Sequence, residues 1–368
     1  MFPTQFTGAS FTWERKELNN ILKINSGRDY KQLNSGNIPV YGTGGYMLSV
    51  NDKLSDTDAV GIGRKGTIDK PLYLKAPFWT VDTLFYCTSK ENSDVKFIYL
   101  LFQIINWKRY DESTGVPSLS KNTISNIKTY VPKIKEQDYI SKLFFSLDNT
   151  LQLHERKCEE LALIKQALLQ KLFPKKDEVI PEVRYKSFSA AWEQRKLGEV
   201  ATFINGRAYK QNELLDSGKY KVLRVGNFYT NDSWYYSNLE LADKYYIDEG
   251  DLVYTWSATF GPHIWNGEKV IYHYHIWKIE LSKFLDRDFT LQILEADKAK
   301  LLANTNGSTM IHVTKKDMES KVISLPNIEE QKKIGSYLMK FDSLITLHQR
   351  KLEKLKQLKK FLLQNMFI

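Results

Sequence analysis

The sequence is poor in cysteine and has no long apolar run. Its 368 residues include two cysteines, Cys87 and Cys158, which stand far apart with no Cys-x-x-Cys spacing. This excludes a disulfide scaffold and a cysteine-rich zinc site, and it is typical of a reducing compartment. The sequence also has no apolar run of 18 residues and does not begin with a basic-plus-apolar signal segment. We therefore expect a cytoplasmic protein that is neither secreted nor inserted in a membrane.

Acidic residues are fewer than basic ones. Lys and Arg number 53 against 43 Asp and Glu, which gives a net charge of +10. Such a balance favours a polyanionic partner such as a nucleic acid, and the alternative is a basic protein without one. The apolar fraction of 42% and the many aromatic residues indicate a folded chain. Its length is sufficient for two domains, each with its own core.

The sequence lacks the short motifs that bind a nucleotide or a methyl donor. Residues 61–66 match Gly-x-Gly-x-x-Gly, but Pro71 and β-forming residues follow instead of the helix that a dinucleotide site requires. We expect a hairpin turn there, with a glycine-rich loop that approaches DNA as the alternative. The segment 40–46 has no Gly-Lys-Ser/Thr, and no Asn-Pro-Pro-Tyr, Asp-Pro-Pro-Tyr or Gly-x-Ser-x-Gly occurs. These absences predict a chain with no catalytic site and no cofactor of its own.

Four histidines could suggest a metal site: His263, His273, His275 and His312. His273 and His275 alternate on one expected strand face, but no His-Glu-x-x-His motif and no carboxylate cluster accompanies them. We predict strand or loop histidines in an aromatic sheet, and no metal ion.

The longest amphipathic segment, residues 136–173, occurs twice. At an offset of 194, 15 of its 38 positions are identical in 330–367, including His-x-Arg-Lys and Leu-Leu-Gln-x-x-Phe, so helix spacing alone does not explain the likeness. Apolar residues recur in steps of four and three, which predicts a heptad seam on a long helix, with His154 and His348 as polar residues that set its register. The seam residues are Leu147, Leu151, His154, Cys158, Leu161, Lys165, Leu168 and Leu172, then Phe341, Ile345, His348, Leu352, Leu355, Lys359, Leu362 and Met366.

A second repeated motif opens each half of the chain. At an offset of 179, Trp13, Leu18, Gly27, Arg28, Tyr30 and Lys31 match Trp192, Leu197, Gly206, Arg207, Tyr209 and Lys210. The offset grows from 179 to 194, so the second half holds about fifteen more residues between the shared ends. Shared ends around different middles indicate one unit that is used twice for related tasks. Residues 174–194, charged and proline-bearing, are the expected linker.

The two middles, 32–131 and 211–325, alternate β-branched and aromatic runs with Gly, Pro and Asn, which predicts short strands and turns. One buried helix is expected within 97–107 and another at about 288–303. The loops between these elements combine Arg, Lys, Asn and small hydroxyl residues, which contact base edges and phosphates in DNA complexes. Any one of these residues alone is typical of an ordinary surface loop. We predict DNA contacts by Arg28, Lys31, Arg64, Lys65, Ser113, Thr114, Ser118, Lys121, Arg207, Tyr209, Lys210, Arg224, Asn227, Trp256, Asn306, Thr309 and Lys315.

Together, these motifs resemble the specificity (S) subunit of type I restriction-modification systems over nearly the whole chain. The likeness lies in Trp-Glu-x-Arg/Lys-x-Leu at 13–18 and 192–197, in Pro-x-x-x-Glu-Gln at 132–137 and 326–331, and in the helices that end Leu-Leu-Gln-x-x-Phe. The resemblance implies an α+β fold in which two pseudo-repeated α/β target-recognition domains are separated by two long antiparallel coiled-coil helices. The implied segments are 1–135 and 174–329 for the domains, the latter with its linker, and 136–173 and 330–368 for the spacer helices.

The resemblance also implies the function and the partners. Each target-recognition domain of that family recognises half of a bipartite double-stranded DNA target, while the helices dock two methyltransferase (M) subunits in a bacterial or archaeal cytoplasm. Translocase-nuclease (R) subunits join the complex. S-adenosylmethionine, ATP and Mg²⁺ belong to these partner subunits, so the S chain is expected to be non-catalytic. A free-standing DNA-binding regulator and an enzyme with a hidden site are the alternatives.

The predicted helix has a length that suits spacing two DNA sites. Residues 147–172 rise roughly 38 Å at about 1.5 Å per residue. Two sites one DNA turn apart are separated by about 34–36 Å. We expect this helix to fix the gap between two half-sites.

Overall fold

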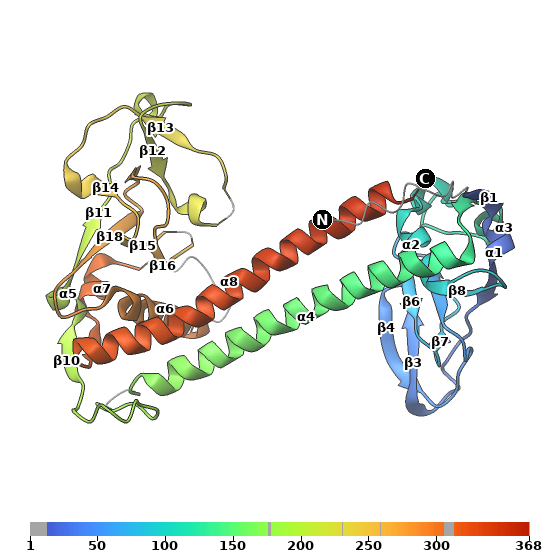
Figure 1. The fold of residues 1–368 in the computed structure, drawn as a ribbon, viewed down its shortest axis with the longest axis horizontal. Coiled ribbons are helices and arrows are strands. Elements are labelled where there is room, and N and C mark those ends of the chain that lie inside the picture. Colours follow the sequence, from blue (N-terminus) through green and yellow to red (C-terminus); the bar gives the residue numbers. More distant parts are fainter. Residues whose placement is uncertain (1–12, 176–177, 230, 258, 305–312, 368) are drawn as a thin grey trace. The chain divides into compact units, whose positions relative to one another are not determined.

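The computed structural model describes residues 13–175, 178–229, 231–257, 259–304 and 313–367. The chain forms two compact units (Figure 1). Unit 1 comprises Met1–Glu155 and Arg350–Ile368, and unit 2 comprises Arg156–Gln349. Each unit combines small sheets with helices, so the fold is α+β as predicted. Unit 1 consists of two chain segments and unit 2 of one, because each of two long helices contributes residues to both units.

These long helices are α4 (Ile134–Leu172) and α8 (Ile328–Asn365). Each begins two residues before the start expected from the sequence, and the other segment boundaries stay predictions. All sixteen predicted seam positions are buried or half-buried, and mostly exposed residues stand between them. Within the described ranges, no helix is long and apolar enough to cross a membrane.

The two long helices run antiparallel within each unit. In unit 1, Asp148 pairs with Lys359 (2.6 Å) and Glu155 with Lys356 (3.2 Å), so residue numbers rise along α4 as they fall along α8. In unit 2, Lys165 pairs with Asp342 (2.5 Å), and the Cys158 thiol donates to the Ile345 carbonyl (4.0 Å). The offset of 194 relates Asp148 to Asp342 and Lys165 to Lys359. The same ion pair is therefore made once in each unit.

Within its described residues, unit 1 forms three sheets, with strand orders β2-β8-β5-β6, β4-β3-β7 and β1-β9. All its strand pairs are antiparallel except β3 with β7. The strands are β1 (Glu14–Glu17), β2 (Leu22–Ser26), β3 (Ser35–Gly42), β4 (Gly45–Val50), β5 (Ala59–Gly63), β6 (Leu72–Leu74), β7 (Trp79–Thr80), β8 (Leu84–Ser89) and β9 (Lys128–Val131). The short helices are α1 (Leu18–Ile21), α2 (Val95–Ile104), η1 (Trp107–Tyr110) and α3 (Lys121–Asn126).

Unit 2 repeats this topology, with orders β11-β18-β15-β16, β13-β12-β17-β14 and β10-β19, and its parallel pair is β12 with β17. Its strands are β10 (Glu193–Lys196), β11 (Ala201–Asn205), β12 (Tyr220–Leu223), β13 (Tyr235–Ser237), β14 (Tyr246–Ile247), β15 (Leu252–Thr255), β16 (Gly261–Ile264), β17 (Val270–Tyr272), β18 (Ile276–Leu281) and β19 (Val322–Leu325). Its helices are α5 (Leu197–Val200), η2 (Gln211–Glu213), η3 (Val225–Phe228), η4 (Asp243–Tyr245), α6 (Arg287–Asn304) and α7 (Lys315–Ser320). The middles differ in sequence but share one fold, and β14 is an addition of unit 2.

A buried glutamine at the start of each long helix explains the repeated Glu-Gln motif. Gln137 and Gln331 are 1% exposed, and each hydrogen-bonds in the same way to a proline carbonyl and to the backbone of the residue before α2 or α6. The bonds are Gln137 Nε2 to Pro132 O (2.8 Å), Asp94 N to Gln137 Oε1 (3.0 Å), Gln331 Nε2 to Pro326 O (2.9 Å) and Asp286 N to Gln331 Oε1 (2.9 Å). Each glutamine thus fastens a sheet-to-helix connection to the long helix.

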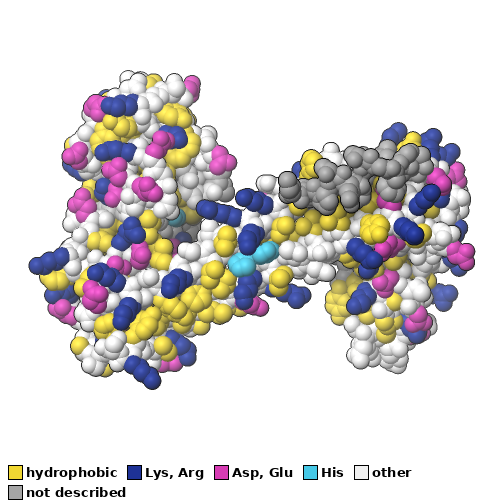
Figure 2. Space-filling view, in the orientation of Figure 1, with side chains coloured by type: hydrophobic (Ala, Val, Ile, Leu, Met, Phe, Trp, Pro, Cys, Tyr) yellow, Lys and Arg dark blue, Asp and Glu magenta, His cyan; other side chains and the backbone are white. Residues whose placement is uncertain are grey.

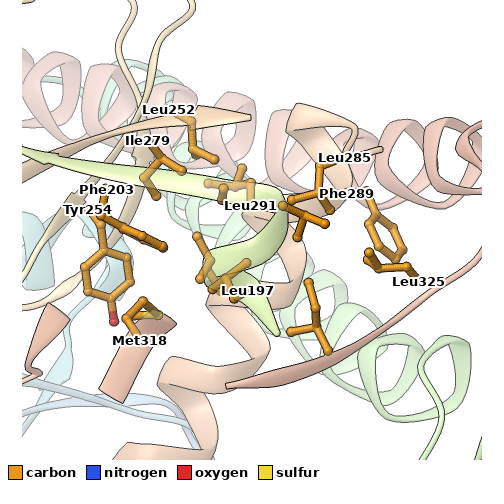
Figure 3. Packing of buried hydrophobic residues seen from close by; sticks show 14 of the residues in the cluster. Leu197, Phe203, Leu252, Tyr254, Ile279, Leu285, Phe289, Leu291, Met318 and Leu325 are labelled. Atoms are coloured by element: carbon orange, nitrogen blue, oxygen red, sulfur yellow. The ribbon is translucent and has the colours of Figure 1, made fainter. Parts of the chain in front are cut away.

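The main core of unit 2 lies between the sheet β11-β18-β15-β16 and α6 (Figure 3). Phe203 and Ile279 of the strands pack with Phe289 and Leu291 of the helix, and Leu172 at the end of α4 joins the same cluster. In unit 1, Phe97 of α2, Phe144 of α4 and the half-buried Phe367 after α8 meet in the corresponding place. The repeated Leu-Leu-Gln-x-x-Phe ends are therefore core segments.

Candidate nucleic-acid interface

In unit 1, several predicted site residues meet at the turn that joins β7 to β8, residues 80–84. Backbone hydrogen bonds from three other segments hold this turn. They are Gly27 N to Leu84 O (3.2 Å), Arg28 N to Thr80 O (2.8 Å), Val81 N to Tyr41 O (3.0 Å) and Arg64 N to Thr83 O (2.8 Å). These four hydrogen bonds, which we call the four-bond support, therefore bring the C-terminal ends of β2, β3 and β5 to one turn.

Unit 2 builds the same support around the turn that joins β17 to β18, residues 272–276. The corresponding bonds are Gly206 N to Ile276 O (3.1 Å), Arg207 N to Tyr272 O (3.0 Å), His273 N to Leu223 O (2.9 Å) and Trp256 N to His275 O (3.2 Å). Each bond has its counterpart in unit 1. We call residues 80–84 and 272–276 the central turns.

The repeated glycine of the opening motif is required because the backbone of a central turn packs directly against its α-carbon. A Cβ on Gly27 would lie 2.0 Å from the carbonyl oxygen of Val81, and one on Gly206 would lie 2.4 Å from that of His273. Real Cβ atoms do not approach a carbonyl oxygen so closely. The Gly-Arg-x-Tyr-Lys motif therefore shapes the support in both units.

Three predicted cations of unit 1, Arg28, Arg64 and Lys65, donate backbone N–H groups to the central turn, and Lys31 follows three residues after Arg28. Arg28, Lys31, Arg64 and Lys65 are exposed, and their side chains make no hydrogen bond or ion pair with any described residue. The hairpin turn predicted at 61–66 is displaced, because residues 61–63 belong to β5 and the connection to the antiparallel strand β6 covers residues 64–71. Free, exposed cations of this kind are available to phosphate groups.

The serine-rich loop of unit 1 is attached to the same place. Lys65 and Ser118 form an antiparallel bridge, and Leu119 N donates to Arg64 O (2.9 Å). Ser113 and Ser118 donate their backbone N–H groups to the Asp111 carboxylate, which lowers the pKa of Asp111. Their role in shaping the loop is thus visible, while Thr114 at its tip is exposed.

Lys121 and Lys315 occupy equivalent positions, each as the first residue of a short helix. The hydroxyl groups of Ser120 and Thr314 cap these helices, α3 and α7. Lys121 is exposed, with its ammonium 5.8 Å from the centre of the Phe85 ring. Lys315 is exposed and pairs loosely with Glu319 (3.6 Å). Asn306 and Thr309 lie outside the described residues.

The repeated arginine has a different role in unit 2. Arg207 makes two hydrogen bonds to Glu213 (2.7 and 2.9 Å) and lies over the Tyr209 ring. This pairing lowers the pKa of Glu213 to about 2. Lys210 remains exposed. The identical motif therefore gives a free cation in unit 1 and a neutralised one in unit 2.

Two other predicted residues of unit 2 are engaged within their own loop. Asn227 accepts from Arg224 N (3.0 Å) and donates to Asn231 O and Ser233 O (both 3.0 Å). The guanidinium group of Arg224 stacks on Tyr235 at 4.2 Å. The amide of Asn227 is thus fully used in this structure, so its predicted base contact gains no support from the geometry.

Aromatic and imidazole rings surround the central turn of unit 2. Trp256 donates its Nε1–H to Tyr274 O (3.0 Å), and its ring lies 4.9 Å from His275 and 5.9 Å from Trp277. Burial lowers the pKa of His273 to about 4, and it also lowers the pKa of His275. Both imidazoles are therefore neutral at pH 7. Among the described residues, no group of His, Cys, Asp and Glu could hold a metal ion.

Side chains of the central turns themselves were not among the predicted site residues. Asp82 and Thr83 of unit 1 correspond in position to Tyr274 and His275 of unit 2. The sequence contains no clear signal for them, because the three-residue intervals 81–83 and 273–275 contain the β-forming residues Val81, Thr83 and Tyr274 and lie inside longer β-forming runs. The sequences of these intervals differ completely, so the equivalence is visible only in the hydrogen bonds.

Comparison with known proteins gives a consistent family. The family model described as type I restriction modification DNA specificity domain matches residues 11–163 and 190–357. The chain is 25% identical over 278 residues to the MjaVIII type I restriction enzyme specificity subunit of Methanocaldococcus jannaschii, covering 69% of this chain and 64% of that protein. It is 24% identical over 325 residues to a putative type I specificity subunit of Haemophilus influenzae, covering 84% and 81%.

The chain spans 64% and 65% of the length of the two Methanocaldococcus jannaschii relatives that it matches. Among solved structures, it resembles a type I restriction-modification S subunit from M. genitalium, with a TM-score of 0.72, 14% identity, and coverage of 100% of this chain and 99% of that one. This likeness concerns the fold. Since the family model matches each repeat in turn, the chain belongs to the type I restriction-modification DNA specificity family and carries its domain twice.

Proposed function

We propose that this chain is the DNA-recognition subunit of a type I restriction-modification complex, in which each unit recognises one part of a bipartite target. One observation carries the proposal: an identical four-bond support occurs in both units but presents different side chains. Two units that share one fold but present different side chains are suited to recognise two different half-sites. The net charge of +10 and the free cations of unit 1 supply the attraction to phosphates.

The long helices are the proposed docking site for two M subunits. Hydrophobic side chains gather along these helices in the part of Figure 2 that holds unit 2. Such exposed apolar surface is typical of a protein interface. The exposed apolar residues include Leu153, Leu163 and Ile164 on α4, and Leu344, Leu347, Leu358 and Phe361 on α8. We further propose that R subunits join through the complex, and that S-adenosylmethionine, ATP and Mg²⁺ act on these partners.

The test is the pattern of DNA methylation in a host that carries this chain with or without a candidate M subunit. Single-molecule sequencing should show a bipartite methyladenine motif only when both proteins are present. A soluble complex that produces no motif would contradict the proposal and favour a free-standing DNA-binding regulator. Binding of S-adenosylmethionine by the isolated chain would instead indicate an enzyme.

A further inference from the structure

We propose that the central turns contain the base-contacting residues of this protein, Asp82 and Thr83 in unit 1 and Tyr274 and His275 in unit 2. The inference rests on the proposed function, which it deepens by naming the specificity residues. In both units the turn is held by four equivalent backbone hydrogen bonds, so its position does not depend on its side chains. Those side chains are free to differ, and they differ in charge, size and shape.

In unit 1 the central turn carries a hydrogen-bond acceptor, Asp82, and the neighbouring segments carry the cations Arg28 and Arg64. Asp82 is exposed and makes no side-chain hydrogen bond or ion pair with the described part of the chain, although the segments of Arg28 and Arg64 flank its turn. A carboxylate is repelled by phosphates but accepts a hydrogen bond from the N4 amino group of cytosine in the major groove. We infer that the half-site of unit 1 contains a cytosine opposite Asp82.

In unit 2 the turn presents uncharged rings. Tyr274 is 38% exposed, and its ring centroid lies 3.9 Å from that of His275. Trp256 fixes both, through its hydrogen bond to Tyr274 O and its edge contact with His275. Rings held in this way offer an apolar face to a thymine methyl group, together with a phenol and an imidazole that donate or accept. Unit 2 therefore recognises its half-site without a charged side chain on its turn.

Competing candidates are less available. The Asn227 amide and the Arg207 guanidinium are engaged within their own unit, and the Ser113 hydroxyl donates to Asp111 (2.9 Å). The free cations Arg28 and Lys65 suit phosphates, which position a protein without carrying sequence information. The central turns carry unit-specific side chains, and those of Asp82, Tyr274 and His275 make no hydrogen bond or ion pair with the described part of the chain.

The experiment is selection of binding sites from random DNA by the complex of this chain with its M subunits. Wild type is compared with Asp82→Ala, Asp82→Asn and His275→Ala. We expect the Asp82 variants to lose roughly 10- to 100-fold of the preference at one base pair of one half-site. His275→Ala should lose preference only within the other half-site.

Glu91→Ala is the matched control, since Glu91 is an exposed acid beyond the opposite end of β8. It should select the wild-type target. Unchanged half-sites in the folded Asp82 and His275 variants would overturn the inference, and so would an equal loss of affinity for every sequence. If the wild-type complex selects no bipartite target, the proposed function fails instead. Melting temperatures identify a variant that is unfolded. If Asp82→Ala is unfolded, Asp82→Asn, which keeps the side-chain volume, tests the inference for unit 1.

Discussion

Gly27 and Gly206 show at the scale of single residues why parts of the repeat persist. Their α-carbons contact the central turns so closely that any side chain would displace the turn. We expect Gly27→Ala to destabilise unit 1 by about 3 kcal/mol or more, because overpacking against backbone cannot relax as a flexible side chain does. Gly44→Ala is the control, since a Cβ there has nothing within 4 Å. Thermal unfolding of both variants checks this, and equal melting temperatures would contradict it.

His263 predicts a pH dependence of unit 2. Its ring stacks on Phe228 at 4.2 Å and its Nε2 lies 3.1 Å from the Tyr229 hydroxyl, while burial, aided by Lys298, lowers its pKa from 6.5 to about 4. The unfolded chain therefore binds a proton at higher pH than the folded one, so stability is complete above pH 6.5 and falls as the pH drops towards 4.

We expect His263 to account for up to about 3 kcal/mol of this loss. The measurement is the melting temperature of wild type and His263→Asn between pH 7.5 and pH 4.5. The variant should melt lower at pH 7.5 but lose less on acidification, and parallel curves for the two proteins would refute the assignment. His273 contributes in the same direction, so a residual slope is expected.

At the scale of elements, the heptad seam could be predicted because its signal is local and occurs twice. The strands of the two middles were also predictable as strands, from runs such as that which forms β5. Their order was not, because strand pairing joins residues far apart and the middles share almost no sequence. The sequence also could not predict that Arg28 is free while Arg207 is paired, because the partner of Arg207, Glu213, belongs to a loop without a counterpart in unit 1.

The reciprocal ion pairs should fix the register of the two long helices. Asp148 and Lys359 are 28% and 22% exposed, so their attraction is less screened than that of a surface pair. We expect Asp148→Lys or Lys359→Asp alone to lower the stability of unit 1 by about 1–2 kcal/mol, and the double swap to restore most of it. The same cycle at the exposed Asp138–Lys142 pair should show almost no coupling. Urea unfolding measures both cycles, and additive effects at 148 and 359 would show that this ion pair does not fix the register of the helices.

At the scale of the whole molecule, the chain uses one architecture for two surfaces and continues both long helices through both units. The supports of the central turns are preserved in hydrogen bonds, whereas the side chains on them are not. The proposed recognition of two half-sites would explain this division, because recognition would then have to differ between the units while the frame that positions it would not. We further predict that the length of the two long helices sets the gap between the half-sites of the target.

Inserting one heptad into each long helix, at equivalent places within 147–172 and 341–366, tests this idea. Seven residues keep the seam in phase and add about 10 Å, which corresponds to roughly three base pairs at 3.4 Å each. We expect site selection to return unchanged half-sites with a gap about three base pairs longer. Affinity should fall as well, because three base pairs turn the second half-site by about 100° around the DNA axis, and DNA or helices must twist to meet it. Recovery of the original gap would show that the helices do not set the spacing.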